Sequence, residues 1–399
     1  MSAYSARAAR PLTLASAGIG VIGASFGMAR YGFGLLAPDI RASFHLDNGS
    51  IGLLSAASYA AYLITSIAAG ALAARLGPRM VVAAGGLCAV AGMLIAGIAA
   101  NPSVLFAGLL VAGASAGLVF PPFSDVVSGF LARASRARVL AAISSGTGWG
   151  VALAAPMALL AGQSWRTAWL LFALVAALAT AWALTVLPPR RPSAPAEVVR
   201  LKPSWFLCPR STRLLMGALL VGLASSIYWT FAVEHLQSQG DLSTTQSRLF
   251  LAVVGLALIG GTVGADAIDR LGARAAFILA AAAEAASLLL LGLTPDAPPA
   301  ALTSALLFGV AYATIVAIAV IWSAKIFAEQ PSAGLAAVMV MNAVGLLIGP
   351  PALGAVADHT GLTSAFIAGT LLMLLTTALA PAEELRRAGQ RGLSPRASD

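Results

Sequence analysis

Apolar segments of about 20 residues, separated by short polar turns, recur along the whole chain and constrain its fold more than any other feature. Of the 399 residues, 59% are hydrophobic and 10% are charged, and the mean hydropathy is +0.89. A soluble domain has about a quarter of its residues charged, so this chain cannot cover itself with a water-facing surface. The apolar segments therefore predict membrane-spanning helices, about a dozen of them, with no room for a sizeable soluble domain.

The hydropathy pattern divides into six predicted helices in each half of the chain. They are expected at 12–37, 51–73, 80–100, 103–127, 139–161 and 166–187, and then at 213–236, 247–267, 274–294, 300–323, 333–356 and 362–380. The predicted organisation is an N-terminal six-helix bundle (1–187), a cytoplasmic linker rich in Pro and Arg (188–212), a C-terminal six-helix bundle (213–382) and a cytoplasmic tail (383–399). The first low-charge segment is too long for a signal-peptide core, so an uncleaved first helix is expected.

The basic residues predict how the chain is oriented. With both termini placed in the cytoplasm, twenty Lys and Arg residues fall on the cytoplasmic side, and Arg41, Arg166 and Arg248 fall outside. This bias is the one that cytoplasmic loops of membrane proteins show. It accounts for the formal charge of +9 without a nucleic-acid partner. Arg30 is assigned to neither side, because it lies inside a predicted helix.

A duplicated hairpin shows that the chain repeats one unit. Gly70-Ala-Leu-Ala-Ala-Arg-Leu-Gly-Pro-Arg79 lies between two apolar segments, and Asp269-Arg-Leu-Gly-Ala-Arg274 lies between two others. Subtracting Arg75 from Arg270 gives 195, close to half of the chain. Glycine permits the tight turn, and the arginines favour the cytoplasmic interface.

The hairpin resembles the signature between the second and third helices of the major facilitator superfamily, Gly-x-x-x-Asp-Arg-x-Gly-Arg-Arg. The first copy departs from it at Ala74 and Pro78, and the second at Ala265. The resemblance implies an all-α membrane protein with twelve helices in two pseudo-symmetric bundles, alternating access between them, and a monomer in the lipid bilayer. It also implies a substrate path lined by the first, fourth, seventh and tenth helices.

Enzyme signatures are absent from the sequence. No Gly-Lys-Ser/Thr loop that cradles phosphate is present, so ATP hydrolysis is not expected to drive transport. The three histidines show no spacing typical of a metal site or a catalytic triad. The sequence therefore predicts a protein that is not an enzyme and needs no cofactor or metal.

Arg30 is the most informative single residue. Gly20, Gly23, Gly27, Arg30 and Gly34 recur at spacings of three and four and form one helical stripe. Small residues mark a face packed on protein, so Arg30 is expected to point inward, where a charged group indicates a functional site. Its fork of donors suits a carboxylate or phosphonate. The alternative is a structural salt bridge.

Aromatic residues on the implied path are the predicted walls of the substrate site. With Arg30, the candidates are Tyr31, Phe123, Tyr228, Trp229 and Tyr312. Rings with hydroxyl or amine tips suit a small organic substrate, although Trp229 suits the membrane interface equally well.

Charged residues near the hairpins predict a cytoplasmic gate that locks the outward-facing state. Its candidates are Arg75, Arg79, Asp125, Asp269 and Arg270. Because Ala74 stands where the superfamily signature has an aspartate, Asp125 is expected to replace the missing acid.

Three further titratable residues are candidates for proton coupling. Glu234 and His235 lie at the expected outer end of the seventh helix, where a solvated pair is the alternative. Glu284 lies near the middle of the ninth helix, where packing is the alternative and a protonated or hydrogen-bonded acid is expected.

Helix-shaping residues complete the candidates. Gly345, Gly349 and Pro350 allow close helix approach and a bend at the contact between the halves, and Pro156 stands at the equivalent place in the first half. The superfamily normally carries such a glycine-proline signature on its fifth helix.

The sequence as a whole predicts a secondary active transporter in the bacterial inner membrane. A symporter that takes up a small organic anion with protons is the first interpretation. A proton-driven exporter of drugs or metabolites is the second. A membrane sensor on the same fold, without transport, is a third.

Overall fold

The helices of the computed structural model follow the apolar segments of the sequence. The structure describes residues 11–162, 164–187, 209–260, 270–328 and 330–381. The first half contains α1 (Pro11–Ile22), the π-helix η2 (Gly23–Met28), α2 (Gly32–Phe44), α3 (Asn48–Leu76), α4 (Pro78–Gly97), α5 (Pro102–Phe130), α6 (Arg133–Leu160) and α7 (Trp165–Val186). The second half contains α9 (Pro209–Ser238), α10 (Thr244–Ile259), α12 (Ala273–Leu293), α13 (Pro298–Ile326), α14 (Pro331–Thr360) and α15 (Leu362–Thr377).

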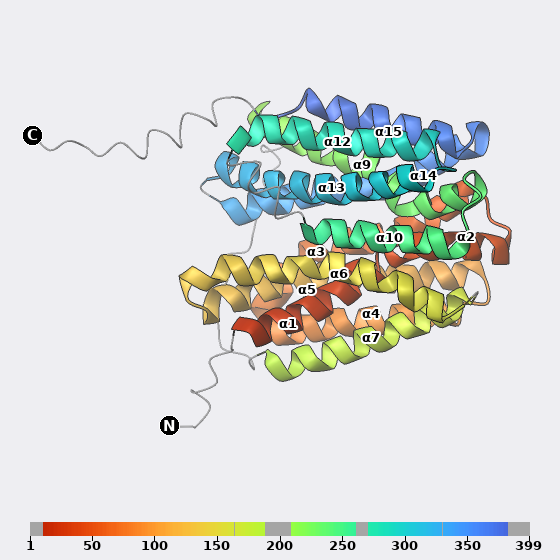
Figure 1. The fold of residues 1–399 in the computed structure, drawn as a ribbon. Helices are drawn as coiled ribbons and strands as arrows, with labels where there is room; N and C mark the ends of the chain where they lie inside the picture. The colour runs from red at the N-terminus through yellow and green to blue at the C-terminus, as the bar shows by residue number, and fades with distance from the viewer. Residues whose placement is uncertain (1–10, 163, 188–208, 261–269, 329, 382–399) are drawn as a thin grey trace, which may run out of the picture.

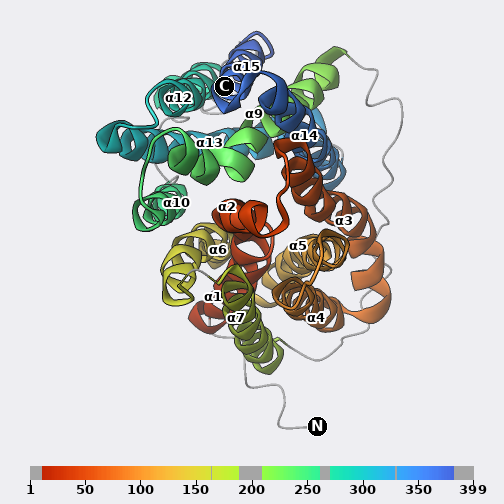
Figure 2. The ribbon, with the colours of Figure 1, turned by 90° about the vertical axis from the view of Figure 1, so that its right-hand side faces the viewer.

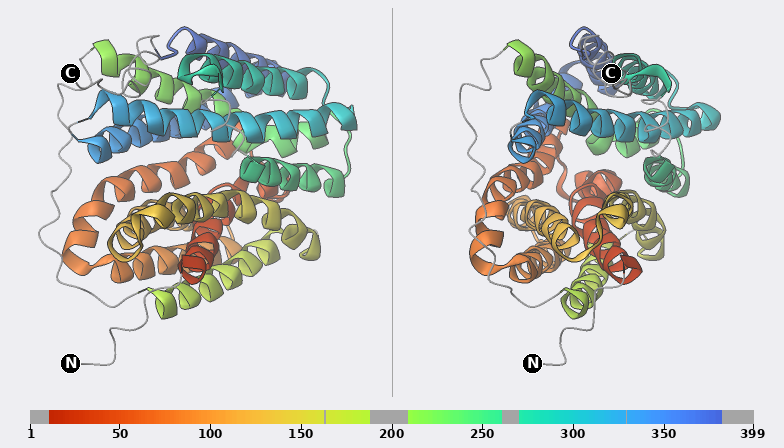
Figure 3. Two further views of the ribbon diagram at one scale, coloured as in Figure 1. Left: turned by 60° about the vertical axis from the view of Figure 1, so that its left-hand side comes forward. Right: turned by 90° about the vertical axis from the view of Figure 1, so that its left-hand side faces the viewer.

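Two groups of helices, one from each half of the chain, lie side by side (Figure 1). Views from either end show the same division, with α1 to α7 in one group and α9 to α15 in the other (Figures 2 and 3). The main contacts between the groups pair α3 with α14, α6 with α10, and α2 with α9. Within the described residues, eleven helices are long and apolar enough to cross a membrane, and α10 is a shorter apolar helix. The all-α membrane fold predicted from the sequence is confirmed.

Most of the predicted helix boundaries lie within four residues of the observed ones, two do not, and the helix end expected at 267 lies outside the described residues. The first helix was expected to end at 37, but it continues through α2 to Phe44 after the π-helical interruption. The helix expected from 139 begins at Arg133. The predicted linker and tail lie largely outside the described residues, and α9 begins at Pro209.

The repeated hairpins have the same backbone conformation at their turns. Gly77 caps the end of α3 with φ 85°, and Gly272 precedes α12 with φ 81°. Positive φ values of this kind are strained for residues that carry a Cβ. The shared glycine of the two copies therefore has a conformational reason.

The glycines before Pro350 pack within the second half, whereas the proline faces the first. A Cβ added at Gly345 would meet the carbonyl of Leu219 on α9, and one at Gly349 would meet the side chain of Ser226. The carbonyl of Pro350, in contrast, lies against Gly52 of α3. Pro156 lies inside α6.

Replacing Gly150 with leucine is expected to destabilise the first half by about 3 kcal/mol, because η2 and α6 touch there through their backbones. Gly27 and Gly150 face each other, and a Cβ at Gly27 would lie 2.5 Å from the Cα of Gly150. Thermal unfolding of the purified protein in detergent measures the loss. Gly129→Leu is the matched control, since a Cβ there meets nothing within 4 Å. Equal unfolding temperatures for the two variants would contradict the packing described.

Candidate substrate site and outer gate

A π-helical segment places Arg30 in the first membrane-spanning unit. The amide of Ala29 donates to the carbonyl of Ala24 at 2.8 Å, and that of Tyr31 donates to Phe26 at 3.2 Å. These bonds span five residues instead of four, and residues 29–31 form a turn before α2 begins. Single π-turns inside helices occur frequently at functional sites. Here the interruption sets Arg30 and Tyr31 between the two halves.

Four aromatic rings surround the guanidinium of Arg30, and we call this group the arginine cage. The Cζ atom of Arg30 lies 4.1 Å from the ring centre of Tyr62, 4.8 Å from Tyr59, 5.0 Å from Tyr31 and 5.6 Å from Phe26. Arg30 is only 5% exposed. Cation–π attraction of this kind partly offsets the cost of desolvating the charge.

The buried charge of Arg30 has no counter-ion among the described residues. No carboxylate there pairs with it, and its Nε atom has no hydrogen-bond partner. A second buried donor without a partner is Nε1 of Trp229, whose ring stacks on Tyr31 of the cage. Unpaired buried donors are costly, so a site of this kind favours a ligand that supplies acceptors and negative charge.

The second half contributes an aromatic wall, made of Trp229, Phe308 and Tyr312, that contacts the cage. Tyr31 stacks on Trp229 with ring centres 4.0 Å apart, and its hydroxyl lies 3.4 Å from that of Tyr312. Trp229 meets Phe308 edge to face at 5.3 Å. The ring of Tyr31 thus joins the buried arginine of one half to the wall of the other.

Not every predicted wall residue lies beside Arg30. Tyr228 stacks on Phe308 at 3.8 Å and bonds to Ser304, which places it behind the wall. Phe123 is fully buried in the core of the first half, beside Val127 and Leu14.

The cage residue Phe26 and the wall residue Phe308 were not among the predicted site residues, and neither were two cage residues on α3, Tyr59 and Tyr62. Their spacing of three residues places them on one face of a helix, which is the signal in the sequence that could have identified them.

A network of polar contacts closes one end of the interface between the halves. We call this the outer end, because it carries the turn between α2 and α3 that the arginine count predicts to lie outside. There the carboxylate of Asp358 on α14 accepts from the backbone amides of Asn48 and Gly49, each at 2.8 Å, and from the side-chain amide of Asn48 at 2.9 Å. The bonds place a negative charge at the N-terminus of α3, where the helix dipole favours it.

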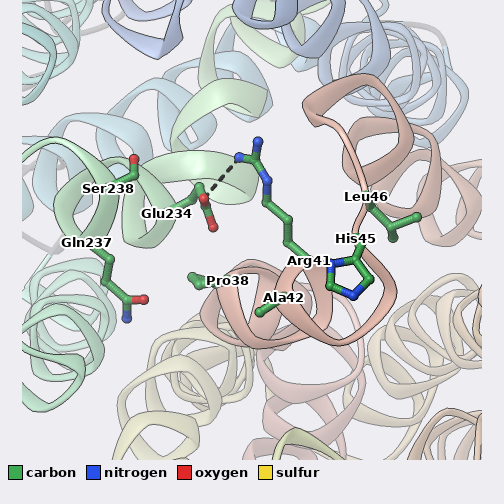
Figure 4. A pocket seen from close by; sticks show the side chains of 8 residues that line it. All are labelled: Pro38, Arg41, Ala42, His45, Leu46, Glu234, Gln237 and Ser238. Atoms are coloured by element: carbon green, nitrogen blue, oxygen red, sulfur yellow. Dashed lines mark hydrogen bonds and ion pairs between the residues drawn. The ribbon is translucent and has the colours of Figure 1, made fainter.

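Arg41 extends this network to α9. Its Nη1 donates to Asn48 Oδ1 at 2.9 Å and to Glu234 Oε1 at 3.0 Å. The pair borders a pocket of about 440 Å³ that is lined also by His45 and Gln237 (Figure 4). We name the residues of the network, Arg41, Asn48, Glu234 and Asp358, the outer gate.

Arg248 makes a separate connection between the halves. Its Nη2 bonds to Asp39 at 2.7 Å, and its Nη1 donates to the carbonyls of Ala158 and Gly162 at 2.8 Å. The sequence predicted Arg248 to lie on the outer side, at the start of the helix expected at 247–267, and it is 2% exposed on α10. These charge-assisted bonds engage both Nη atoms of the buried guanidinium, whereas its Nε has no partner among the described residues.

The predicted cytoplasmic gate is not assembled among the described residues. Arg75, Asp125 and Arg270 are exposed. No hydrogen bond or ion pair joins Asp125 to Arg75 or Arg79 in the described part of the chain. Asp269 lies outside the described residues. That these side chains form a gate stays a prediction. It concerns a state of the protein that is closed on the cytoplasmic side.

The three proton-coupling candidates have different surroundings. Glu234 belongs to the outer gate. His235 is fully buried, stacked on Phe366 at 4.8 Å and bonded to the carbonyl of Gly292 at 3.3 Å, so the solvated pair considered from the sequence does not occur. Glu284 is fully buried on α12 with one oxygen 2.5 Å from Ser225. The described residues contain no group of three or more His, Cys, Asp or Glu side chains that could hold a metal.

Two halves built from long apolar helices, joined at one end by a network of polar contacts, define a multi-pass membrane protein. The family model described as "Uncharacterised MFS-type transporter YbfB" matches residues 22–380. The chain belongs to this family of major facilitator superfamily transporters, as the duplicated hairpin predicted.

Relatives and solved structures agree with this assignment. Monocarboxylate transporter 11 of Homo sapiens is 31% identical over 237 residues, and that of Mus musculus is 31% identical over 242. Each match covers 57% of this chain, and the chain spans about half the length of these relatives, 50% and 52%.

Three solved transporters share the fold at low sequence identity. The nucleoside transporter NupG has a TM-score of 0.73 at 14% identity, covering 92% of this chain and 98% of its own. A D-xylose-proton symporter has a TM-score of 0.71 at 15% identity, with 92% and 96% covered. A bacterial homologue of the human lysosomal transporter Spinster, inward-facing and unoccupied, has a TM-score of 0.68 at 17% identity, with 94% and 95% covered.

Proposed function

We propose that this protein is a proton-coupled symporter that takes up a small organic anion across the bacterial inner membrane, with both termini in the cytoplasm. The observation that carries the proposal is the buried Arg30, which has no carboxylate partner among the described residues. A substrate carboxylate there would accept from the guanidinium fork and from Trp229 Nε1.

The surroundings of Arg30 also support a substrate with an apolar body. The cage and the wall present the faces and edges of aromatic rings, and none of their residues carries a carboxylate. The anion class agrees with the printed name of the monocarboxylate relatives, and proton coupling agrees with that of the xylose symporter. Closure of the outer end by Asp358 and Arg41 supports alternating access, because it seals one side of the site.

A proton-driven exporter is the second candidate, and the aromatic wall is the observation that favours it. Aromatic rings such as those of Trp229 and Phe308 also suit lipophilic drugs. In that case Arg30 would be a structural residue held by its cage.

Thermal unfolding with a panel of ligands separates these candidates. Lactate and benzoate represent organic anions, tetraphenylphosphonium a lipophilic cation, and uridine a neutral solute. A ligand present at 100 times its dissociation constant raises the stability of the protein by about 2.7 kcal/mol. We expect stabilisation by at least one anion and none by the cation. Stabilisation by tetraphenylphosphonium alone would favour the exporter and reject the anion symporter.

A further inference from the structure

Glu284 is a buried acid whose hydrogen-bond geometry indicates whether it carries a proton. It lies on α12 with 0% exposure, and its Oε1 is 2.5 Å from the hydroxyl oxygen of Ser225 on α9. The same hydroxyl is 2.7 Å from the carbonyl of Val221. Oε2 of Glu284 has no partner.

Two short contacts to one hydroxyl group require two protons. A serine hydroxyl has one proton, and the carbonyl of Val221 can only accept, so the Ser225 proton goes to Val221. The short contact to Glu284 then needs a proton on the acid, which donates to the Ser225 oxygen. An ionised Glu284 would in addition leave Oε2 negative and without a donor in an apolar interior, which is strongly unfavourable.

No counter-charge near Glu284 offers another explanation among the described residues. Of the titratable groups on the helices packed against α12, Tyr228 of α9 faces Glu284, and its hydroxyl is engaged by Ser304. The other titratable groups lie away from Glu284. His235 lies near Gly292, Tyr312 lies beside Tyr31, and Glu234 belongs to the outer gate. Arg213 and Lys325 lie near the inner ends of their helices, and α15 carries no titratable group.

We propose that Glu284 is the proton-binding site of this transporter, neutral when the outer end is closed and ionised at another stage of the cycle. The residue lies in the middle of α12, eleven residues after Ala273 and nine before Leu293 (284 − 273 and 293 − 284). Its hydrogen-bond partner lies on α9, one turn before Trp229, which stacks on Tyr31 of the substrate site. A displacement of α9 therefore changes both the partner of the acid and the aromatic wall.

Infrared difference spectroscopy tests the protonation state without any substrate. The spectrum of the wild type minus that of Glu284→Gln is expected to contain the carbonyl band of a protonated carboxylic acid at neutral pH. Glutamine keeps a donor for Ser225, so the variant should fold. Should it not, Glu284→Asp, which keeps the acid and shifts the band, provides the assignment. A difference spectrum with only carboxylate bands would overturn the proposal.

Transport in proteoliposomes tests the role in coupling, and this part alone rests on the proposed function. Benzenesulfonate is the probe, because it stays ionised and does not cross a bilayer unaided as neutral benzoic acid does. With an acidic exterior, one proton per anion allows about tenfold accumulation per pH unit of gradient. We expect Glu284→Gln to exchange benzenesulfonate across the membrane but not to accumulate it. The matched control is Asp296→Asn, an exposed acid in the loop after α12, which should accumulate the anion like the wild type.

The two tests fail in different ways. Accumulation by Glu284→Gln equal to that of the wild type would show that the proton is carried elsewhere and would overturn the inference, with anion transport intact. Absence of benzenesulfonate transport in the wild type would count against the proposed substrate class, whereas the infrared result would still decide whether Glu284 holds a proton.

Discussion

Replacing Arg30 with glutamine is expected to weaken the binding of organic anions by roughly 10- to 100-fold, the equivalent of about 1.5–3 kcal/mol for a hydrogen bond to a charged group. The protein without ligand should unfold at the same temperature as the wild type or higher, because the variant removes a buried charge that has no carboxylate partner among the described residues. Thermal unfolding with and without benzoate measures both effects. Loss of the ligand response without loss of stability separates a binding role from a structural one.

Two further arginine variants sharpen this prediction. Arg30→Lys keeps the charge but lacks the planar fork, so it should bind the anion with intermediate affinity. Arg166→Gln is the matched control, since Arg166 also lies over a ring, 4.1 Å from Trp165, but is satisfied by the carbonyl of Ala99. A destabilised Arg30→Gln protein that still binds benzoate would mean that Arg30 is structural.

Replacing Gly52 with leucine is expected to hold the outer end open. A Cβ at Gly52 would meet the carbonyl and the Cα of the Pro350 to Pro351 segment of α14, so the halves cannot approach there. A steric cost of about 3 kcal/mol moves the equilibrium between the two states by roughly 100-fold. The predicted result is a protein trapped open to the outside, which binds the anion and does not transport it.

Distances between spin labels on the two halves measure this shift. Ser164→Cys and Thr244→Cys place labels on exposed positions of the first and second half, with the native Cys88 and Cys208 changed to serine. Gly52→Leu should lengthen the distance. Gly70→Leu, on the same helix with no atom within 4 Å of its Cβ, should leave it unchanged. An unchanged distance in both variants would show that the contact at Gly52 does not govern closure.

The helices α2 and α9 connect the candidate substrate site to the outer gate. Tyr31, which precedes α2, stacks on Trp229 of α9, and the carbonyl of Trp229 lies against Gly34. One to two turns further out, Arg41 of α2 reaches Glu234 of α9. An anion bound at Arg30 would therefore change the contact between the helices that close the outer end. Packed helices of this kind can couple a binding site to a gate.

The helices could be predicted because a long apolar segment can satisfy its own backbone hydrogen bonds in a bilayer by forming a helix. The spacing of Arg30 among glycines likewise predicted a buried residue, and the structure buries it. The end of the first helix was missed because hydropathy falls after 37, whereas Asp39 and Arg41 continue the helix by pairing with the second half. Contacts of this kind between distant segments leave no local signal.

Some members of the candidate site were predicted from the sequence and others were missed. Trp229 and Tyr312, predicted from the lining helices of the superfamily, meet there with ring centres 5.6 Å apart. Tyr59 and Tyr62 join Arg30 through the packing of α3. Phe123 lies on a predicted lining helix, but it turns into the core of its own half.

Uptake of benzenesulfonate, an anion that does not cross a bilayer unaided, by proteoliposomes that contain the wild type or Arg30→Gln tests the central claim most directly. With an acidic exterior, the wild type should accumulate the anion, and the rate should fall at least tenfold in the variant, as the loss of about 1.4 kcal/mol or more implies. Equal uptake by both proteins would contradict the assignment of Arg30 as the residue that binds the substrate.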